Sequence, residues 1–161
     1  MAQFDITHVS IFCDGLDHPE GLAFAADGSL WAGGEAGQVY RIAPDGKSVE
    51  MVANVGGFNL GLAFDRQGNC YLCNHHLPAV VRVTPEGQAS IFADEVDGKK
   101  IRVPNMPCFD WEGNLYVSDS GDWYGNNGVV YRFTPDGRGT VFAGPFDFTN
   151  GLAIDAKGEY L

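Results

Sequence analysis

The sequence of 161 residues predicts an all-β fold, specifically a β-propeller of four-stranded antiparallel blades. The first supporting observation is a short apolar pattern that occurs four times. The position of Gly21 recurs at Gly61, Met106 and Gly151, in steps of 40, 45 and 45 residues. A period of about 40–50 residues is typical of propellers and solenoids. The second observation is that no stretch shows the sustained 3.6-residue apolar periodicity of an amphipathic helix.

Each repeat contains the same predicted strands and turns in the same order. An apolar first strand, such as residues 21–24, is followed by a glycine turn and a second strand. A variable loop leads to a third strand, and a turn of the form Pro-Asp-Gly or Pro-Glu-Gly leads to the fourth. Glycine supplies the positive φ that such hairpins need, and proline favours the first central turn position. The predicted blades span residues 20–53, 60–93 and 105–143, and residues 150–161 begin another.

The first strand of each repeat is the most apolar and is expected to lie innermost, beside the central channel. The residues predicted to be buried in these strands or between blades are Leu22, Phe24, Leu62, Phe64, Phe109, Leu152 and Ile154.

The two ends of the chain also fit the repeat. Residues 7–12 resemble a fourth strand without its blade, which would close a propeller ring by pairing with the last blade. Residues 151–161 align with residues 21–31. We therefore expect residues 1–161 to form one partial propeller domain with about three to four blades. Either a second chain or missing C-terminal blades would complete the ring and cover its exposed strand edges.

Charge and composition exclude some classes of partner. The formal net charge is −11, which argues against binding to nucleic acid or to an anionic membrane surface. Residues 1–5 show no basic segment followed by an apolar run, so we expect no secretory signal and a cytoplasmic protein with reduced thiols. Cys70 and Cys73 form a CxxC pair, but strand residues three apart face opposite sides, which favours small buried residues over a metal clip.

The residue before the Gly21 position carries the candidate chemistry. It is Glu20, Leu60, Asn105 or Asn150 in successive repeats, so three of the four have oxygen-bearing side chains. Repetition about an axis would bring these side chains together at the channel mouth. One carboxylate and two amide oxygens suit Ca²⁺, Mg²⁺ or Mn²⁺. The structural alternative is ordinary turn sequence, since Asn-Gly and Pro-Glu-Gly are both common in loops.

The repeats resemble the family of six-bladed propellers that includes gluconolactonase, senescence marker protein and luciferin-regenerating enzyme. The matching segments are residues 18–21, 103–105, 114–119, 128–132 and 149–153. The resemblance implies six blades and a divalent cation on the axis, with Ca²⁺ first and Mg²⁺, Mn²⁺ or Zn²⁺ as alternatives. On that pattern Glu20 and Asn150 are metal ligands, and Asn105 is a ligand or a substrate contact. The implied reaction is metal-dependent hydrolysis of a lactone, such as a sugar lactone, in which a carboxylate activates water.

The sequence departs from this family at two places. Met106 follows Asn105 where the family commonly has an aspartate, and Arg102 lies farther from this position than the family's arginine. The aspartate that completes the family's metal site, and is its proposed base, lies in a later blade beyond Leu161. The catalytic base is therefore unknown in this chain, and the 161-residue piece alone is expected to be inactive.

Further candidates lie in loops after the second strands. Asp119 and Asp122 are expected to face the substrate, with a solvated loop as the alternative. Trp123 and its neighbour Tyr124 are expected to form a substrate-binding lid, with surface aromatics as the alternative. The adjacent histidines at 75–76 fit surface positions better than ligand positions, because adjacent side chains diverge in extended backbone. Competing functions are a non-catalytic binding or scaffold propeller, and a propeller like strictosidine synthase or streptogramin lyase.

Overall fold

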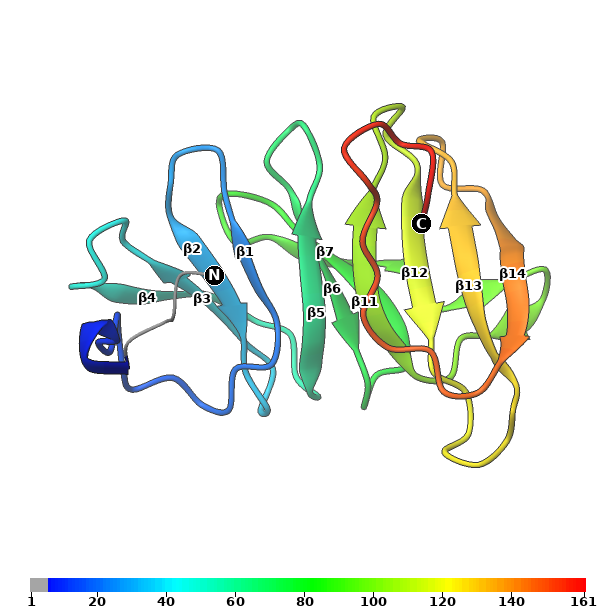
Figure 1. The fold of residues 1–161 in the computed structure, drawn as a ribbon, viewed down its shortest axis with the longest axis horizontal. Helices are drawn as coiled ribbons and strands as arrows, with labels where there is room; N and C mark the ends of the chain where they lie inside the picture. Colours follow the sequence, from blue (N-terminus) through cyan, green and yellow to red (C-terminus); the bar gives the residue numbers. More distant parts are fainter. Residues whose placement is uncertain (1–5) are drawn as a thin grey trace.

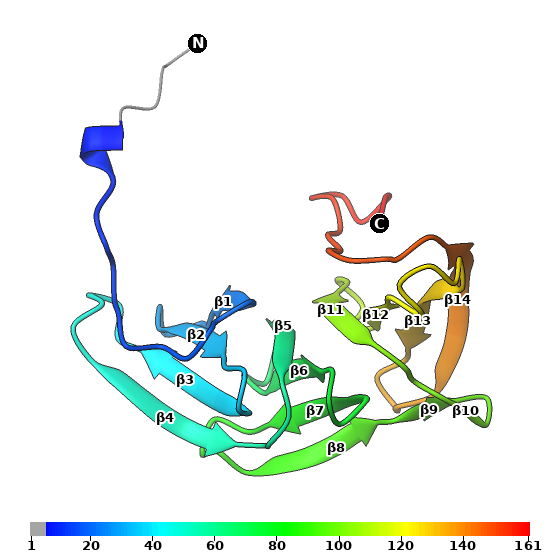
Figure 2. The same ribbon diagram turned by 90° about the horizontal axis from the view of Figure 1, so that it is seen from below.

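The computed structural model describes residues 6–161, which form an arc of propeller blades (Figures 1 and 2). Three four-stranded antiparallel sheets follow one another along the chain, each with its strands in sequential order. The innermost strands are β1, β5 and β11, and β4, β8 and β14 lie at the outer rim (Figure 2). The predicted all-β propeller fold is confirmed. The expectation about a secretory signal concerns residues 1–5 and lies outside the described residues.

The strands have the following bounds. The first blade contains β1 (Leu22–Phe24), β2 (Leu30–Gly33), β3 (Gln38–Ile42) and β4 (Val49–Asn54). The second contains β5 (Asn59–Phe64), β6 (Cys70–Asn74), β7 (Ala79–Val83) and β8 (Ala89–Ala93). The third contains β11 (Pro104–Phe109), β12 (Leu115–Asp119), β13 (Gly128–Phe133) and β14 (Gly139–Phe146). A small hairpin of β9 (Glu95–Val96) and β10 (Lys99–Lys100) joins the last two blades, and a 3₁₀ turn, η1 (Ile6–His8), precedes the first. No helix among residues 6–161 is long and apolar enough to cross a membrane.

One aspartate-centred turn explains much of the sequence period. In the third blade the Asp110 amide donates to the Asn114 carbonyl at 3.0 Å, and the Asp110 carboxylate accepts the Asn114 amide at 2.8 Å. Asp65 makes the same bonds in the second blade. The turn appears again near the C-terminus, where the Asp155 amide donates to the Tyr160 carbonyl at 3.0 Å. The fourth repeat therefore keeps its turn, although residues 150–161 form no strand.

The innermost strands pack closely because glycine occupies the repeated position. A Cβ built on Gly21 would stand 2.2 Å from the carbonyl oxygen of Leu60, and one on Gly61 would stand 2.6 Å from that of Asn105. Both distances are far below van der Waals contact, so only glycine allows this approach. The backbone of each inner strand therefore lies directly against the next.

The core consists of two clusters, one in each space between blades. Strand β6 contributes to both, since alternate side chains in a strand face opposite sides. Cys70 and Leu72 pack toward the first blade, and Tyr71 and Cys73 pack toward the third. All of β6 is buried because the middle blade has a neighbour on each face. Burial raises the pKa of the Cys73 thiol well above its ordinary value, which agrees with the prediction that these cysteines are structural.

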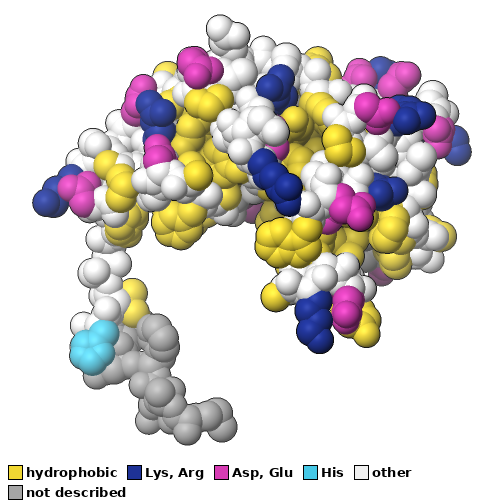
Figure 3. Space-filling model, turned by 90° about the horizontal axis from the view of Figure 1, so that it is seen from above, with side chains coloured by type: hydrophobic (Ala, Val, Ile, Leu, Met, Phe, Trp, Pro, Cys, Tyr) yellow, Lys and Arg dark blue, Asp and Glu magenta, His cyan; other side chains and the backbone are white. Residues whose placement is uncertain are grey.

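Burial in the inner strands differs from the sequence prediction at the first blade. Leu62 is buried as expected, and Phe64 and Phe109 are half-buried between blades. Leu22 and Phe24, in contrast, are 58% and 72% exposed. Their side of the first blade has no neighbouring blade among the described residues, so their apolar character alone does not bury them. Apolar side chains gather along the inner, concave side of the arc (Figure 3).

Two terminal segments also differ from expectation. Residues 9–14 form no strand; instead the chain at Phe12 lies against the turn between β3 and β4, where a Cβ on Gly46 would stand 2.2 Å from the Phe12 carbonyl oxygen. The closing strand predicted for residues 7–12 belongs to no sheet among residues 6–161. Leu152 and Ile154 are half-buried in a segment without strand pairing.

Candidate functional site

The candidate site lies at the channel mouth, where β1, β5 and β11 begin and β2, β6 and β12 end. Because the strands are antiparallel, these ends share one edge of the arc. This edge is at the bottom of Figure 1 and faces the viewer in Figure 2. The loops at the mouth therefore carry residues from every repeat.

Two serines of the third blade link the strand of Asn105 to the backbone at Thr149 and Asn150. Asn105 Nδ2 donates to Ser120 Oγ at 3.2 Å, and Ser120 Oγ donates to the Thr149 carbonyl at 2.6 Å. Ser118 Oγ donates to the Asn150 carbonyl at 2.6 Å. Both serines are buried, so these hydroxyls hold the backbone on each side of β12 in a fixed register. The amide oxygen of Asn105 remains available as an acceptor because its nitrogen is the end that faces Ser120.

Glu20 lies farther round the mouth than the two asparagines. It begins the first blade, and two close contacts between inner strands separate it from Asn105, one at Gly21 with Leu60 and one at Gly61 with Asn105 itself. The structure therefore links the Asn105 side chain to the backbone next to Asn150 and places Glu20 on the opposite side of Leu60. Its carboxylate is exposed.

These donors fit a hard cation better than a soft one. Glu20 supplies a carboxylate, and Asn105 and Asn150 supply amide oxygens, which are the ligands that Ca²⁺ and Mg²⁺ prefer. No group of three or more His, Cys, Asp or Glu side chains suited to a metal occurs among residues 6–161. A cation here would therefore depend on the asparagine oxygens together with Glu20.

Sequence reasoning missed a histidine beside Glu20. His18 has a φ of 42°, an unusual value for a residue other than glycine. Its Nδ1 lies 2.9 Å from Glu35 Oε2, and its Nε2 lies 3.7 Å from Glu20 Oε1. The imidazole thus stands between two exposed carboxylates at the mouth. The 17-residue separation between His18 and Glu35 gives no local sequence signal of the pair.

Asp119 has a structural role instead of the substrate contact expected from the sequence. It is 2% exposed, and its carboxylate accepts backbone amide hydrogens from Arg102 at 2.8 Å, Val103 at 2.9 Å and Gly121 at 3.0 Å. The Tyr131 hydroxyl lies 3.3 Å away. Burial, reinforced by the nearby Asp119 charge, raises the pKa of Tyr131 to about 12. Asp119 therefore ties the loops on both sides of the third blade to its sheet.

The loop at residues 121–127 carries the predicted aromatic lid. Asp122 accepts a hydrogen bond from Asn127 Nδ2 at 2.8 Å and pairs with Arg102 Nη1 at 2.8 Å. The Asn127 hydrogen bond, followed by the Arg102 charge, lowers the pKa of Asp122 below its ordinary value. Trp123 is exposed, and its ring lies 4.3 Å from that of Phe148. The loop is thus held by polar contacts beneath an exposed aromatic surface.

The two histidines that follow β6 lie at the same edge of the arc, where the Phe58 ring stands 5.7 Å from the ring of His18. The His75 and His76 rings lie 5.1 Å apart, and the His76 ring is 6.1 Å from that of Phe58. Neither histidine belongs to a metal-binding group of the described chain. His76 is exposed, as expected for a surface histidine, and His75 is half-buried.

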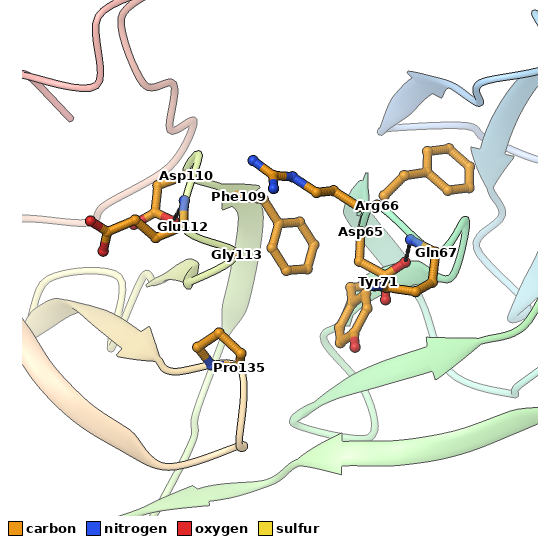
Figure 4. A pocket seen from close by; sticks show the side chains of 10 residues that line it. Asp65, Arg66, Gln67, Tyr71, Phe109, Asp110, Glu112, Gly113 and Pro135 are labelled. Atoms are coloured by element: carbon orange, nitrogen blue, oxygen red, sulfur yellow. Dashed lines mark hydrogen bonds between the residues drawn. The ribbon is translucent and has the colours of Figure 1, made fainter.

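A separate groove of about 260 Å³ lies on the opposite face, between the second and third blades. Figure 4 shows Arg66 extending across it from the second blade and Tyr71, Phe109 and Pro135 around it. The Arg66 guanidinium donates to the carbonyl of Trp111 in the next blade. The groove is therefore spanned by a contact between blades and is remote from the mouth.

Comparison with known proteins finds similarity both to strictosidine synthase-like proteins and to gluconolactonases. Residues 11–42 match the family model "Strictosidine synthase-like, N-terminal". Protein STRICTOSIDINE SYNTHASE-LIKE 8 of Arabidopsis thaliana is 30% identical over 91% of this chain and 47% of its own length. The chain thus spans about half of this relative.

Solved structures show the same architecture. XC5397 from Xanthomonas campestris, described as a gluconolactonase important in glucose secondary metabolic pathways, superposes with a TM-score of 0.80 and 26% identity, over 91% of this chain and 54% of that one. Virginiamycin B lyase from Staphylococcus aureus superposes with a TM-score of 0.63 and 20% identity, over 79% of this chain and 41% of that one, which shows a shared fold alone. The resemblance to gluconolactonase-like propellers is confirmed. The chain therefore has the fold of the gluconolactonase propellers and is similar in sequence to the strictosidine synthase-like proteins.

Proposed function

We propose that this chain forms the cation-binding part of a lactone hydrolase, with its site at the channel mouth. The observation that supports the proposal most is the joint fixation of Asn105 and Asn150 by the hydroxyls of Ser120 and Ser118. This arrangement occurs in a chain whose fold matches a gluconolactonase. The substrate class would be a cyclic ester.

In this proposal Glu20, Asn105 and Asn150 hold a divalent cation, with Ca²⁺ preferred over Mg²⁺, Mn²⁺ and Zn²⁺. The chemistry that such a cation supplies is polarisation of the lactone carbonyl. Ser120 orients the Asn105 amide so that its nitrogen faces the protein and its oxygen remains free. A carboxylate in a later blade is the expected base for the attacking water.

Replacement of Glu20 by glutamine is expected to weaken Ca²⁺ binding at least about tenfold, because the change removes the only negative charge in the ligand set. Calorimetric titration of Ca²⁺ and Mn²⁺ into the wild-type protein and Glu20→Gln measures this. Glu86→Gln, on an exposed turn of the second blade, is the matched control and should bind like the wild type. Equal affinities for wild type and Glu20→Gln would contradict the assignment of Glu20 as a ligand.

The second candidate is a strictosidine synthase-like propeller with other chemistry at the same mouth. It is favoured by the family match at residues 11–42 and by the Arabidopsis thaliana relative. A lactone-opening assay that follows acid release separates the two candidates. Cation-dependent opening of a lactone by the protein with its ring complete supports the hydrolase, and its absence with Ca²⁺ bound supports the alternative.

We also propose that further blades, from a second copy or from additional sequence of the protein, cover the first and third blades. The exposed Leu22 and Phe24 lie on one uncovered face. At the other end of the arc a cavity of about 350 Å³, lined by residues including Val130, Phe142 and Leu152, remains between the third blade and the C-terminal segment. Exposed apolar faces of this kind mark interaction surfaces.

Phe24→Lys is expected to weaken self-association of the 161-residue chain about tenfold or more, because it places a charge in an apolar interface. Sedimentation equilibrium measures the change. Tyr124→Lys, at a 92% exposed aromatic on the mouth loop, is the matched control and should associate like the wild type. A stable monomer at all concentrations would contradict coverage by a second copy and leave additional sequence of the protein as the source of the further blades.

A further inference from the structure

An aromatic surface borders the proposed site at the third blade. We call it the aromatic wall, and it consists of Trp123 and Phe148. Their rings are 4.3 Å apart and meet edge to face, a favoured geometry for aromatic pairs. Trp123 is nevertheless 64% exposed, so most of its indole contacts solvent. A large exposed aromatic surface of this kind is available for contact with a ligand.

The wall is connected to the two asparagines through the chain. Trp123 follows Ser120, whose hydroxyl accepts from Asn105 and donates to Thr149. Phe148 directly precedes Thr149 and Asn150. In addition, Thr149 Oγ1 donates to the Asp119 carbonyl at 2.7 Å. The segments that fix Asn105 and Asn150 therefore also fix the two sides of the wall.

The loop that carries Trp123 is ordered before any ligand arrives. The Asp122 amide donates to Asn127 Oδ1 at 2.9 Å, and the Gly125 amide donates to the Asp122 carbonyl at 2.8 Å. Arg102 adds its ion pair with Asp122 from the loop before β11. A preformed contact surface binds more tightly because less conformational entropy is lost on binding.

The polar groups beside the wall are paired with one another. The Asp122 carboxylate is shared by Arg102 and Asn127, and the Asp119 carboxylate accepts backbone amides. These side chains are therefore already engaged with protein groups and offer less hydrogen-bonding capacity to the hydroxyls of a sugar than unpaired side chains would. Hydroxyls that lose water without new hydrogen bonds raise the free energy of the complex, whereas apolar groups lower it by leaving water.

From these contacts we infer that the aromatic wall selects a lactone with an apolar alkyl or aryl substituent over a polyhydroxylated sugar lactone. The inference rests on the proposed function, since it assigns the substrate class of that same site. In this arrangement the lactone ring lies toward Asn105 and Asn150, and the substituent lies against Trp123. Trp123 is then a specificity-determining residue that takes no part in proton transfer.

The test compares two tryptophans of equal exposure on opposite faces. Trp111 is also 64% exposed, but it lies in the turn between β11 and β12, at the other end of the blade from the mouth. Binding of an octyl-substituted γ-lactone and of gluconolactone is measured by calorimetry, with Ca²⁺ present, for the wild type, Trp123→Ala, Trp123→Phe and Trp111→Ala. We expect Trp123→Ala to weaken binding of the alkyl lactone about tenfold, Trp123→Phe to retain most of it, and Trp111→Ala to change nothing.

The result that overturns the inference is wild-type protein that binds gluconolactone as tightly as the alkyl lactone, or Trp123→Ala that binds the alkyl lactone like the wild type. Failure of the proposed function gives a different result. In that case the alkyl lactone binds in a manner dependent on Trp123, but Glu20→Gln leaves Ca²⁺ binding unchanged and no ring opening follows. Circular dichroism of each variant confirms that altered binding does not reflect loss of the fold.

Discussion

Replacing Gly61 by alanine is expected to destabilise the fold by about 3 kcal/mol, because the added methyl group overpacks the contact between two inner strands. The alanine Cβ would stand 2.6 Å from the Asn105 carbonyl oxygen and 2.8 Å from the Met106 Cα. Both atoms belong to backbone, so no side-chain rotation relieves the clash. Urea unfolding followed by circular dichroism measures the loss.

Gly151 provides a control at the same position of the repeat. No atom lies within 4 Å of a Cβ built on Gly151, and its φ is not in the left-handed region. Gly151→Ala is therefore expected to leave stability unchanged or to raise it by a few tenths of a kcal/mol, since alanine restricts the unfolded chain. Similar unfolding midpoints for Gly61→Ala and Gly151→Ala would show that the inner strands can separate without penalty, and would contradict the packing described here.

Replacing Asp119 by alanine is expected to lower the free energy of unfolding by at least about 3 kcal/mol, since several buried donors lose a charged acceptor. The amides of Arg102, Val103 and Gly121 would all lose their partner, and so would the Tyr131 hydroxyl. Asp119→Asn retains the shape but replaces one acceptor oxygen by an NH₂ group that faces other donors. It should be intermediate.

Glu86→Ala removes an exposed acid from the second blade and is expected to change stability by less than about 0.5 kcal/mol. If Asp119→Ala unfolds at the same urea concentration as Glu86→Ala, the carboxylate is not the anchor of the third blade. Near-ultraviolet circular dichroism adds a local readout, because loss of the anchor should also disorder the aromatic loop that follows it.

The repeat explains why the fold was predictable from the sequence. Each apolar strand is followed by an aspartate or glycine turn, and these local signals do not depend on distant residues. The exposure of Phe24 was not predictable in this way, because its local sequence matches that of the half-buried Phe64. Burial of a blade face depends on whether another blade stands beside it. The absence of a strand at residues 9–12 has the same explanation, since a strand requires a neighbouring strand and no sheet among residues 6–161 includes this segment.

The candidate site was predictable only in part. The register of the repeats predicted that the Asn105 and Asn150 side chains would converge, and the structure links the Asn105 side chain to the backbone next to Asn150 through Ser120. The serines that hold them were missed, because Ser118 and Ser120 give no sequence signal that distinguishes a buried hydroxyl from an exposed one. Asp119 was assigned to the substrate because it is acidic and follows a strand. Its backbone partners, Arg102 and Val103, come from a loop that only the folded topology places beside it.

The middle blade has a neighbouring blade on each of its two faces, and this affects how the chain unfolds locally. Strand β6 loses water on both faces, whereas β1 and β14 each leave large apolar side chains in solvent. Exchange of backbone amide protons in a repeat protein follows such differences in local free energy. The amide protons of β6 should therefore exchange with solvent only when the whole chain unfolds. The two outer blades should open independently of each other. The middle blade is then the cooperative unit on which the remaining blades assemble.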